Sequence, residues 1–199
     1  MNFDGALAFQ PDFTCEWRVY VNADLDNAPI IFSHVLDLFT DLKCRITSAK
    51  ITTVLAEASK RTDVIVIYTD SEDSAKRVSS CLLFNLDVSR RLGAENVHMA
   101  CRRGRGVAIG ESPVAISEIS FGDLRAAVLS LAVRNVCQHP GNADLDFHTF
   151  LHDLNYWLPF FIRAFGLSEQ DSFRNGDTSK QPKTKEELRA KLKYWEKQI

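Results

Sequence analysis

Ser120 and Arg125 stand at the start of a predicted helix, where their chemistry suits phosphate. Ser120 is a favoured N-cap residue, and Asp123 three positions later is the acidic partner of a capping box. The first turn of a helix carries unpaired N–H groups and partial positive charge, and Arg125 adds a full charge one turn further on. This arrangement is typical of an anion site. The alternative is an ordinary capped helix with a surface arginine.

More side chains that bind phosphate follow the predicted strands. In residues 17–23, Trp17, Val19 and Val21 alternate with polar residues, which predicts a strand with one buried and one open, polar face. The polar face and the neighbouring segments carry Arg18, Tyr20, Asn22, Lys50, Arg61, Tyr68, His98 and Arg103. Cations gathered in a protein of net charge −2 indicate a small anionic ligand. A solvated strand face is the alternative.

Two other patterns do not support a cofactor site. Gly104, Gly106 and Gly110 follow a predicted strand but do not open a helix, as a dinucleotide-binding glycine motif requires. His148 and His152 are four residues apart on a predicted helix, but no carboxylate completes a catalytic zinc signature. The sequence therefore predicts neither a bound dinucleotide nor a bound metal.

The composition is that of an ordinary globular protein. The chain has 199 residues, of which 45% are hydrophobic and 25% are charged. A net charge of −2 argues against a surface built for nucleic acid. No apolar run is long enough for a membrane span, and the N-terminus lacks the features of a signal peptide. The five cysteines are odd in number and widely spread, so we expect reduced thiols and a cytoplasmic protein.

Hydrophobic periodicity predicts an α+β fold. The predicted strands are 17–23, 43–53, 63–69 and 97–101, and the predicted helices are 29–42 and 71–92. This order, β-α-β-β-α-β, is the split βαβ arrangement, an antiparallel sheet with helices on one face. The alternation slips within the second strand, so we expect a bulge near Thr47 and Ser48.

The C-terminal part is predicted to be helical. One helix begins after Ser120, and a second contains Pro159, where we expect a kink. Thr184 and Glu187 form another capping box. The expected organisation is one domain over 1–167, with a sheet part at 16–113 and a helical part at 119–167, then a polar linker at 168–183 and a C-terminal helix at 184–199.

Five short motifs occur in an order that resembles a known family. They are Arg-Val-Tyr-Val-Asn at 18–22, Ala-Lys-Ile at 49–51, Arg-Thr-Asp-Val-Ile-Val-Ile-Tyr at 61–68, Gly-Val at 106–107 with Gly-Glu-Ser-Pro at 110–113, and Ser-Phe-Gly at 120–122 with Arg125. The series resembles the HopA-type family, named for a type III secretion effector. Its relatives include stand-alone lyases of class V lanthipeptide and thioamitide biosynthesis. The resemblance covers residues 16–165.

The resemblance implies a phosphothreonine lyase, which eliminates phosphate from a phosphorylated Ser or Thr of a precursor peptide and leaves a dehydrated residue. It implies that Lys50 is the base that takes the α-proton and that Arg61 and Arg125 bind the phosphate. His98 is our choice of acid, from the phase of its strand. The other expected substrate or phosphate ligands are Arg18, Tyr20, Asn22, Tyr68, Arg103 and Ser120. This chemistry needs no metal and no organic cofactor.

The expected partner is the phosphorylated peptide. Family members usually have a substantial region before the first strand, whereas this protein has residues 1–15. We therefore expect either a dedicated lyase that works with a separate kinase-like phosphotransferase, or a binding remnant without activity. No membrane partner is expected.

Two alternatives stay open. A non-catalytic partner would hold a phosphopeptide, a leader peptide or a kinase, with Tyr156-Trp157 and Phe160-Phe161 as docking residues, although most such clusters are core. An RNA-recognition module would stack bases on Tyr20 and Tyr68. The RNA alternative is weakened by the negative net charge and by residues 62–69, which lack the glycine and paired aromatics of that motif.

Overall fold

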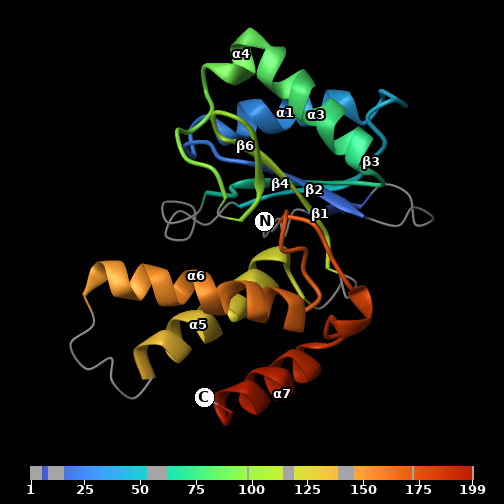
Figure 1. Cartoon of the computed structure of the whole chain (residues 1–199). Coiled ribbons are helices and arrows are strands. Elements are labelled where there is room, and N and C mark those ends of the chain that lie inside the picture. Colours follow the sequence, from blue (N-terminus) through green and yellow to red (C-terminus); the bar gives the residue numbers. More distant parts are fainter. Residues whose placement is uncertain are drawn as a thin grey trace. The chain divides into compact units, whose positions relative to one another are not determined.

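The computed structural model describes residues 6–8, 16–52, 62–97, 99–113, 119–138, 146–171 and 173–198. The protein divides into two compact units, Met1–Glu111 and Ser112–Ile199. The first unit is a sheet with helices and the second is helical (Figure 1). No described helix is both long enough and apolar enough to cross a membrane.

The described part of the first unit contains a six-stranded sheet in which every neighbouring pair is antiparallel. In sequence order its strands are β1 (Ala6–Ala8), β2 (Trp17–Val21), β3 (Ile46–Ile51), β4 (Ile65–Thr69), β5 (Cys101–Gly104) and β6 (Val107–Glu111). Across the sheet their order is β1-β3-β4-β2-β6-β5. Strand β2 lies between β4 and β6, as the split βαβ arrangement requires. The predicted α+β class and antiparallel sheet are confirmed.

The predicted strand at 97–101 is wrong. Strand β6 pairs with β2 in its place, and β5 forms a hairpin with β6. The apolar residues Val97, Met99 and Cys101 do alternate, but Met99 has φ +59°, which an extended strand does not allow. Gly106 has φ +65° in the hairpin turn, and its carbonyl accepts a hydrogen bond from the Asn22 N–H at 2.8 Å. The backbone therefore turns at Gly106 and returns as β6.

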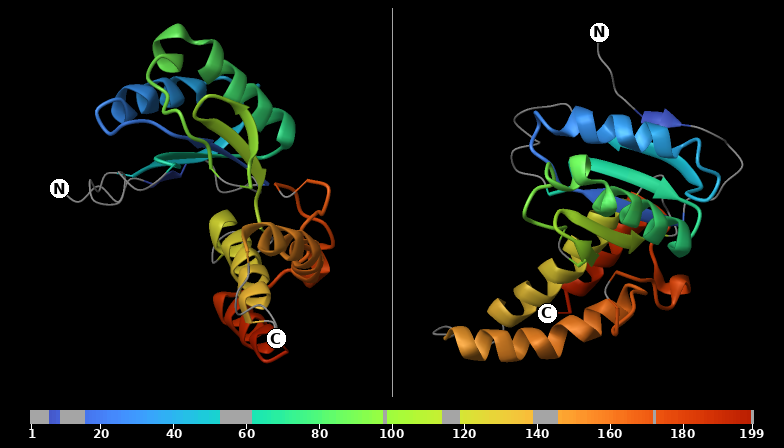
Figure 2. Two further views of the ribbon diagram at one scale, coloured as in Figure 1. Left: turned by 60° about the vertical axis from the view of Figure 1, so that its left-hand side comes forward. Right: turned by 90° about the horizontal axis from the view of Figure 1, so that it is seen from above.

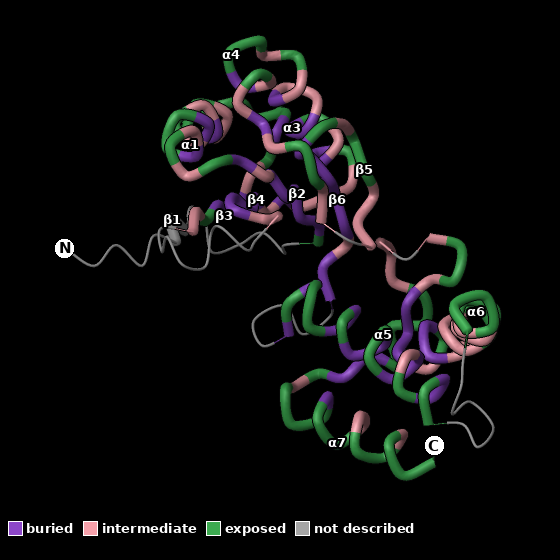
Figure 3. The backbone as a smooth tube through the Cα atoms, turned by 90° about the vertical axis from the view of Figure 1, so that its left-hand side faces the viewer, coloured by how far each residue is buried: buried purple, intermediate pink, exposed green. Residues whose placement is uncertain are grey.

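Helices α1 (Ala28–Leu38) and α3 (Glu72–Phe84) and the short helix α4 (Leu86–Ser89) cover one face of this sheet (Figure 2). A Cβ added at Gly104 of β5 would meet the Leu83 side chain of α3 at 2.6 Å. Gly104 pairs with Val107, and Val107 pairs with Val21 of β2, so this phase of the sheet faces the helices. The core between the layers contains Val19, Val21, Ile31, Val35, Ile65, Ile67, Val78 and Ile109, all fully buried (Figure 3).

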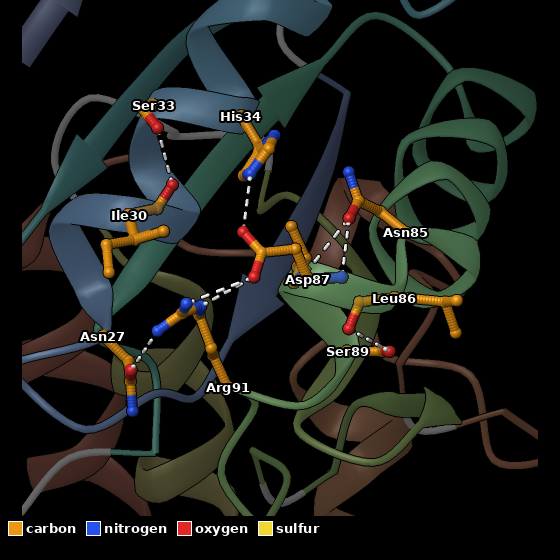
Figure 4. Close-up of polar contacts among 10 residues, drawn as sticks. Asn27, Ile30, Ser33, His34, Asn85, Leu86, Asp87, Ser89 and Arg91 are labelled. Carbon is orange, nitrogen blue, oxygen red and sulfur yellow. Dashed lines mark hydrogen bonds and ion pairs between the residues drawn. The ribbon is translucent and has the colours of Figure 1, made fainter.

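The predicted helix at 71–92 is interrupted at Asn85. This residue caps α4, because its side-chain oxygen accepts hydrogen bonds from the N–H groups of Asp87 and Val88. Asp87 then joins α4 to α1, because its carboxylate lies 3.5 Å from His34 Nε2 and accepts from Arg91 (Figure 4). Hydrogen bonds from Arg91, and then from His34, lower the pKa of Asp87. This exposed network orients α4 on α1, and exposed ion pairs stabilise a fold only slightly.

The second unit is built from α5 (Phe121–Gln138), α6 (Phe147–Ala164) and α7 (Lys185–Glu196), with a 3-10 helix, η1 (Thr178–Lys180). Pro159 lies inside α6, which continues to Ala164. The core of this unit contains Ile119, Leu124, Val128, Leu131, Ala132, Phe161, Ile162, Phe165, Leu167 and Leu188, so α7 packs into the same cluster as α5 and α6.

The segment 168–183, predicted as a linker, has specific contacts within the second unit. Gln181 is 4% exposed, and its side-chain amide donates to Gly166 O at 3.1 Å and to Asn175 Oδ1 at 2.6 Å. Leu167 and Asn175 form an antiparallel bridge. These contacts fasten the segment that precedes α7 to the residues that follow α6.

Candidate functional site

Lys50, Arg18 and Tyr68 lie on the face of the sheet away from α1 and α3, which we call the outer face. Tyr68 of β4 pairs with Arg18 of β2 on one side and with Ser48 of β3 on the other. Lys50 pairs with Val66, which precedes Tyr68 on the same face. Direct cross-strand partners project from the same face of a sheet. Arg18, Tyr68 and Lys50 alternate along their strands with the residues that face the helices, so they project from the opposite face.

The two cations flank one aromatic ring. The Arg18 Cζ is 5.2 Å from the centroid of the Tyr68 ring, and the Lys50 Nζ is 5.7 Å from it. Both distances are within the range of cation–π attraction. Lys50 is exposed and Tyr68 half-buried. Within the described residues Lys50 makes no ion pair. Its ammonium group is therefore available to a ligand.

A β-bulge sets the direction of Lys50. The pairing of β3 with β4 shifts between Ile46 and Ser48, which confirms the bulge predicted near Thr47 and Ser48. The extra residue, Thr47, is buried, and its hydroxyl donates to Tyr68 O at 3.2 Å. Because a shift of one residue exchanges the two faces of a strand, the bulge moves Lys50 to the outer face.

The outer face is not open along its whole width. Arg18 and Tyr20 of β2 are each 4% exposed, so the expectation of an open, solvated strand face is wrong there. Side-chain alternation alone does not show how deeply a central strand is buried. At β3 the face is open as expected, because the side chain of Lys50 is exposed.

Asn22 lies just past the end of β2 and links three segments. Its side-chain amide donates to Glu95 O at 3.1 Å, and its carbonyl accepts from Gly93 N at 2.8 Å. Its own N–H donates to the carbonyl of Gly106. These contacts fasten the β5–β6 hairpin to the end of β2, while a role of Asn22 in binding substrate stays a prediction.

Strand register places Arg102, an arginine that sequence reasoning did not select, on the outer face. Arg102 pairs with Ala108, and Ala108 pairs with Tyr20, in the cross-strand row that also contains Lys50. Arg103, the predicted ligand, lies where the pairing of β5 with β6 shifts. Both arginines are exposed. Arg102 would have been selected if the sequence had been interpreted as a β5–β6 hairpin, in which two short strands flank the turn at Gly106.

The start of α5 has the predicted capping box. The Asp123 N–H donates to Ser120 Oγ at 3.0 Å, and the Ser120 N–H donates to Asp123 Oδ2 at 3.0 Å. Arg125 is 2% exposed, and its Cζ lies 3.5 Å from the centroid of the Phe121 ring. The alternative of a surface arginine is therefore wrong. Ser120 and Arg125 belong to the second unit, and their roles as phosphate ligands stay predictions.

Two predicted site residues, Arg61 and His98, lie outside the described residues. Their roles as phosphate ligand and acid stay predictions. In the part of the protein that the structure describes, no three His, Cys, Asp or Glu side chains gather as metal ligands would.

The fold has a counterpart among solved structures. No protein-family model and no curated protein matches the sequence. Among solved structures, the chain is similar to the effector protein from Pseudomonas syringae pv. tomato strain DC3000, with a TM-score of 0.62 and 17% sequence identity. The match covers 84% of this chain and 60% of the effector, so the chain spans less than two thirds of the effector's length. At this identity the likeness concerns the fold alone, and the protein has a fold similar to that of a bacterial effector protein.

Proposed function

We propose that this protein is a carbon–oxygen lyase that eliminates phosphate from phosphothreonine or phosphoserine in a precursor peptide. The product is a dehydroamino acid of the kind made in lanthipeptide and thioamitide biosynthesis. The observation that carries the proposal is the exposed Lys50, which lies with Arg18 against the ring of Tyr68. The five ordered motifs and the effector-like fold support the same assignment.

The chemistry assigned to Lys50 is proton abstraction. After giving up its ammonium proton to water, the Lys50 amine takes the α-proton of the phosphorylated residue, the C–H electron pair forms the Cα=Cβ double bond, and the Cβ–O bond breaks as phosphate leaves. The α-proton of a peptide is a very weak acid, so the base must be held close to it. The bulge at Thr47 and the pairing of β3 with β4 fix where Lys50 projects.

Arg18 supplies positive charge beside this base. Its guanidinium is always charged and is 4% exposed, so water screens its field weakly. A cation held in place stabilises the charge that develops on the departing phosphate without further reorganisation. The stack on Tyr68 holds the guanidinium in position.

The substrate requires an earlier reaction. A phosphorylated Ser or Thr is made by phosphoryl transfer to a hydroxyl group, so the proposal needs a kinase-like phosphotransferase as partner. The elimination itself needs no metal and no organic cofactor.

A non-catalytic peptide-binding partner is the second candidate, and a groove in the second unit favours it. The groove has a volume of about 470 Å³ and lies between α5 and α7. Leu131, Leu188 and Leu192 form apolar lining, and Asp123, Lys185, Arg189 and Glu196 contribute charges. A groove with both apolar and charged lining residues suits a peptide helix. By contrast, the predicted docking residue Phe161 is 1% exposed and belongs to the core.

The RNA-binding alternative finds less support. Tyr20 and Tyr68 do lie on neighbouring central strands. However, Tyr20 is 4% exposed, and a base needs an open ring face on which to stack.

Mass spectrometry of a phosphothreonine peptide incubated with the protein tests the proposal. A lyase releases phosphate and leaves a peptide lighter by one phosphoric acid, in which the Cα–H and Cβ–O bonds are lost and the Cα–Cβ bond is a double bond. A phosphatase contaminant would instead restore threonine, which has a different mass. Binding of the peptide with no change in its mass would favour the second candidate.

A further inference from the structure

We propose that the outer edge of β5 binds an extended, acidic segment of the phosphopeptide substrate as an additional strand. The inference rests on the proposed function for the identity of the peptide. It extends that function by naming the kind of sequence that the substrate carries and its distance from the phosphorylated residue.

The position of β5 in the sheet provides the backbone groups. Strand β5 is last in the strand order, and among the described strands it pairs with β6 alone. The free side of an edge strand presents N–H and C=O groups that an extended peptide can pair with. Helix α3 covers one face of this strand, through the contact of Leu83 with Gly104.

The charge of this edge selects the peptide. Arg102 and Arg103 in β5 and Arg105 in the turn are all exposed. Within the described residues, none of the three makes an ion pair or a side-chain hydrogen bond. Other described arginines are paired, for example Arg45 with Asp70 and Arg134 with Glu196. Three such cations within four residues, in a protein of net charge −2, complement Asp and Glu side chains.

Strand spacing relates this edge to Lys50. Arg102 and Lys50 stand in one cross-strand row, separated by four strand spacings. At about 4.8 Å per spacing the distance is about 19 Å, which an extended peptide spans with about six residues. The acidic segment should therefore lie at least about six residues from the phosphorylated Ser or Thr.

Charged residues on an edge strand have a simpler explanation, because they also prevent edge-to-edge aggregation. Fluorescence anisotropy with labelled peptides distinguishes peptide binding from protection against aggregation. The probe is an extended peptide with four consecutive Glu residues, a spacer of six residues and an unphosphorylated Thr. Since this probe cannot undergo elimination, its binding is independent of turnover.

We expect Arg102→Glu combined with Arg103→Glu to weaken this binding by about tenfold or more. The matched control is Arg77→Glu with Arg90→Glu, which makes the same change of charge at exposed positions on α3 and after α4, and it should bind as the wild type does. Circular dichroism confirms that each variant is folded. Equal weakening by both pairs would overturn the proposal, because it would show a general effect of net charge.

Two further probes test the mode and the class of ligand. A peptide N-methylated at alternate residues cannot pair along one side, so it should bind about tenfold more weakly. Equal affinity of this peptide would overturn strand addition. Displacement of the acidic peptide by single-stranded RNA at equal charge concentration would indicate a general polyanion surface and would also overturn it. If peptides bind as expected but none is eliminated, the lyase proposal alone fails.

Discussion

The Lys50 ammonium lies 5.7 Å from the centroid of the Tyr68 ring on the neighbouring strand. Ser48 is the direct partner of Tyr68, so Lys50 is a diagonal neighbour, within reach of an aromatic ring. Arg18 approaches the same ring from β2. The bulge at Thr47 produces this relationship.

Substitution of Tyr68 tests whether the ring holds these cations. Tyr68→Leu should lower the free energy of unfolding by about 1 kcal/mol, since a cation–π contact contributes about 0.5–1 kcal/mol and the site is partly exposed. Tyr68→Phe keeps the ring and should retain most of that stability. Denaturant unfolding measures both. If Tyr68→Phe is as destabilised as Tyr68→Leu, the ring is not what holds the two side chains.

Substitution by alanine should change the free energy of unfolding in opposite directions at Gly106 and Gly122. Gly106 has φ +65°, and an added Cβ would lie 2.7 Å from Gly93 O, so Gly106→Ala should cost more than about 1 kcal/mol. Gly122 is near the start of α5, where an added Cβ would lie 3.8 Å from Ser120 Oγ, an ordinary contact distance. Gly122→Ala should therefore stabilise by about 0.5 kcal/mol. Denaturant unfolding measures both changes. A tolerated Gly106→Ala would contradict the hairpin that replaced the predicted strand at 97–101.

The Cys44 thiol should resist alkylation. Burial, and then the neighbouring Cys81 and Asp41, raise the pKa of Cys44 to about 12. The thiolate is the reactive form, so at pH 8 only about one Cys44 in 10⁴ is ready to react. Iodoacetamide labelling followed by peptide mass mapping should modify the exposed Cys137 long before Cys44.

Asp41→Asn provides the control for this experiment. The change removes a negative charge 3.6 Å from Cys44 Sγ, so the pKa of Cys44 should fall and its labelling should become faster. Labelling of Cys44 at the rate of Cys137 in the wild type would show that the thiol is not buried as described.

Local patterns in the sequence correctly predicted the features that depend on neighbouring residues. The alternation in β2 and the capping box of Ser120 and Asp123 each follow from side chains a few positions apart. The bulge was predictable because the apolar phase changes between Ile46 and Ala49. The paired strands then brought Arg18, Tyr68 and Lys50 together as expected.

Features that depend on tertiary packing were not predictable in this way. The alternation at Val97 and Met99 suggested a strand, but Met99 has a left-handed backbone conformation, which an extended strand does not allow. The burial of Arg125 and Tyr20 depends on which surfaces pack over them, and helical or strand periodicity carries no such information. Arg102 was missed because the register of a short hairpin decides which of two adjacent arginines lies on the outer face.

Lys50 is proposed as the base of the elimination. Single-turnover elimination from a phosphothreonine peptide, followed by mass spectrometry, should be slowed about 10²–10⁴-fold in Lys50→Met, while the affinity for the peptide stays nearly unchanged. Lys50→Arg should not restore the rate, because an arginine does not deprotonate usefully near neutral pH. Equal rates of elimination by the wild type and Lys50→Met would contradict this role and remove Lys50 from the mechanism.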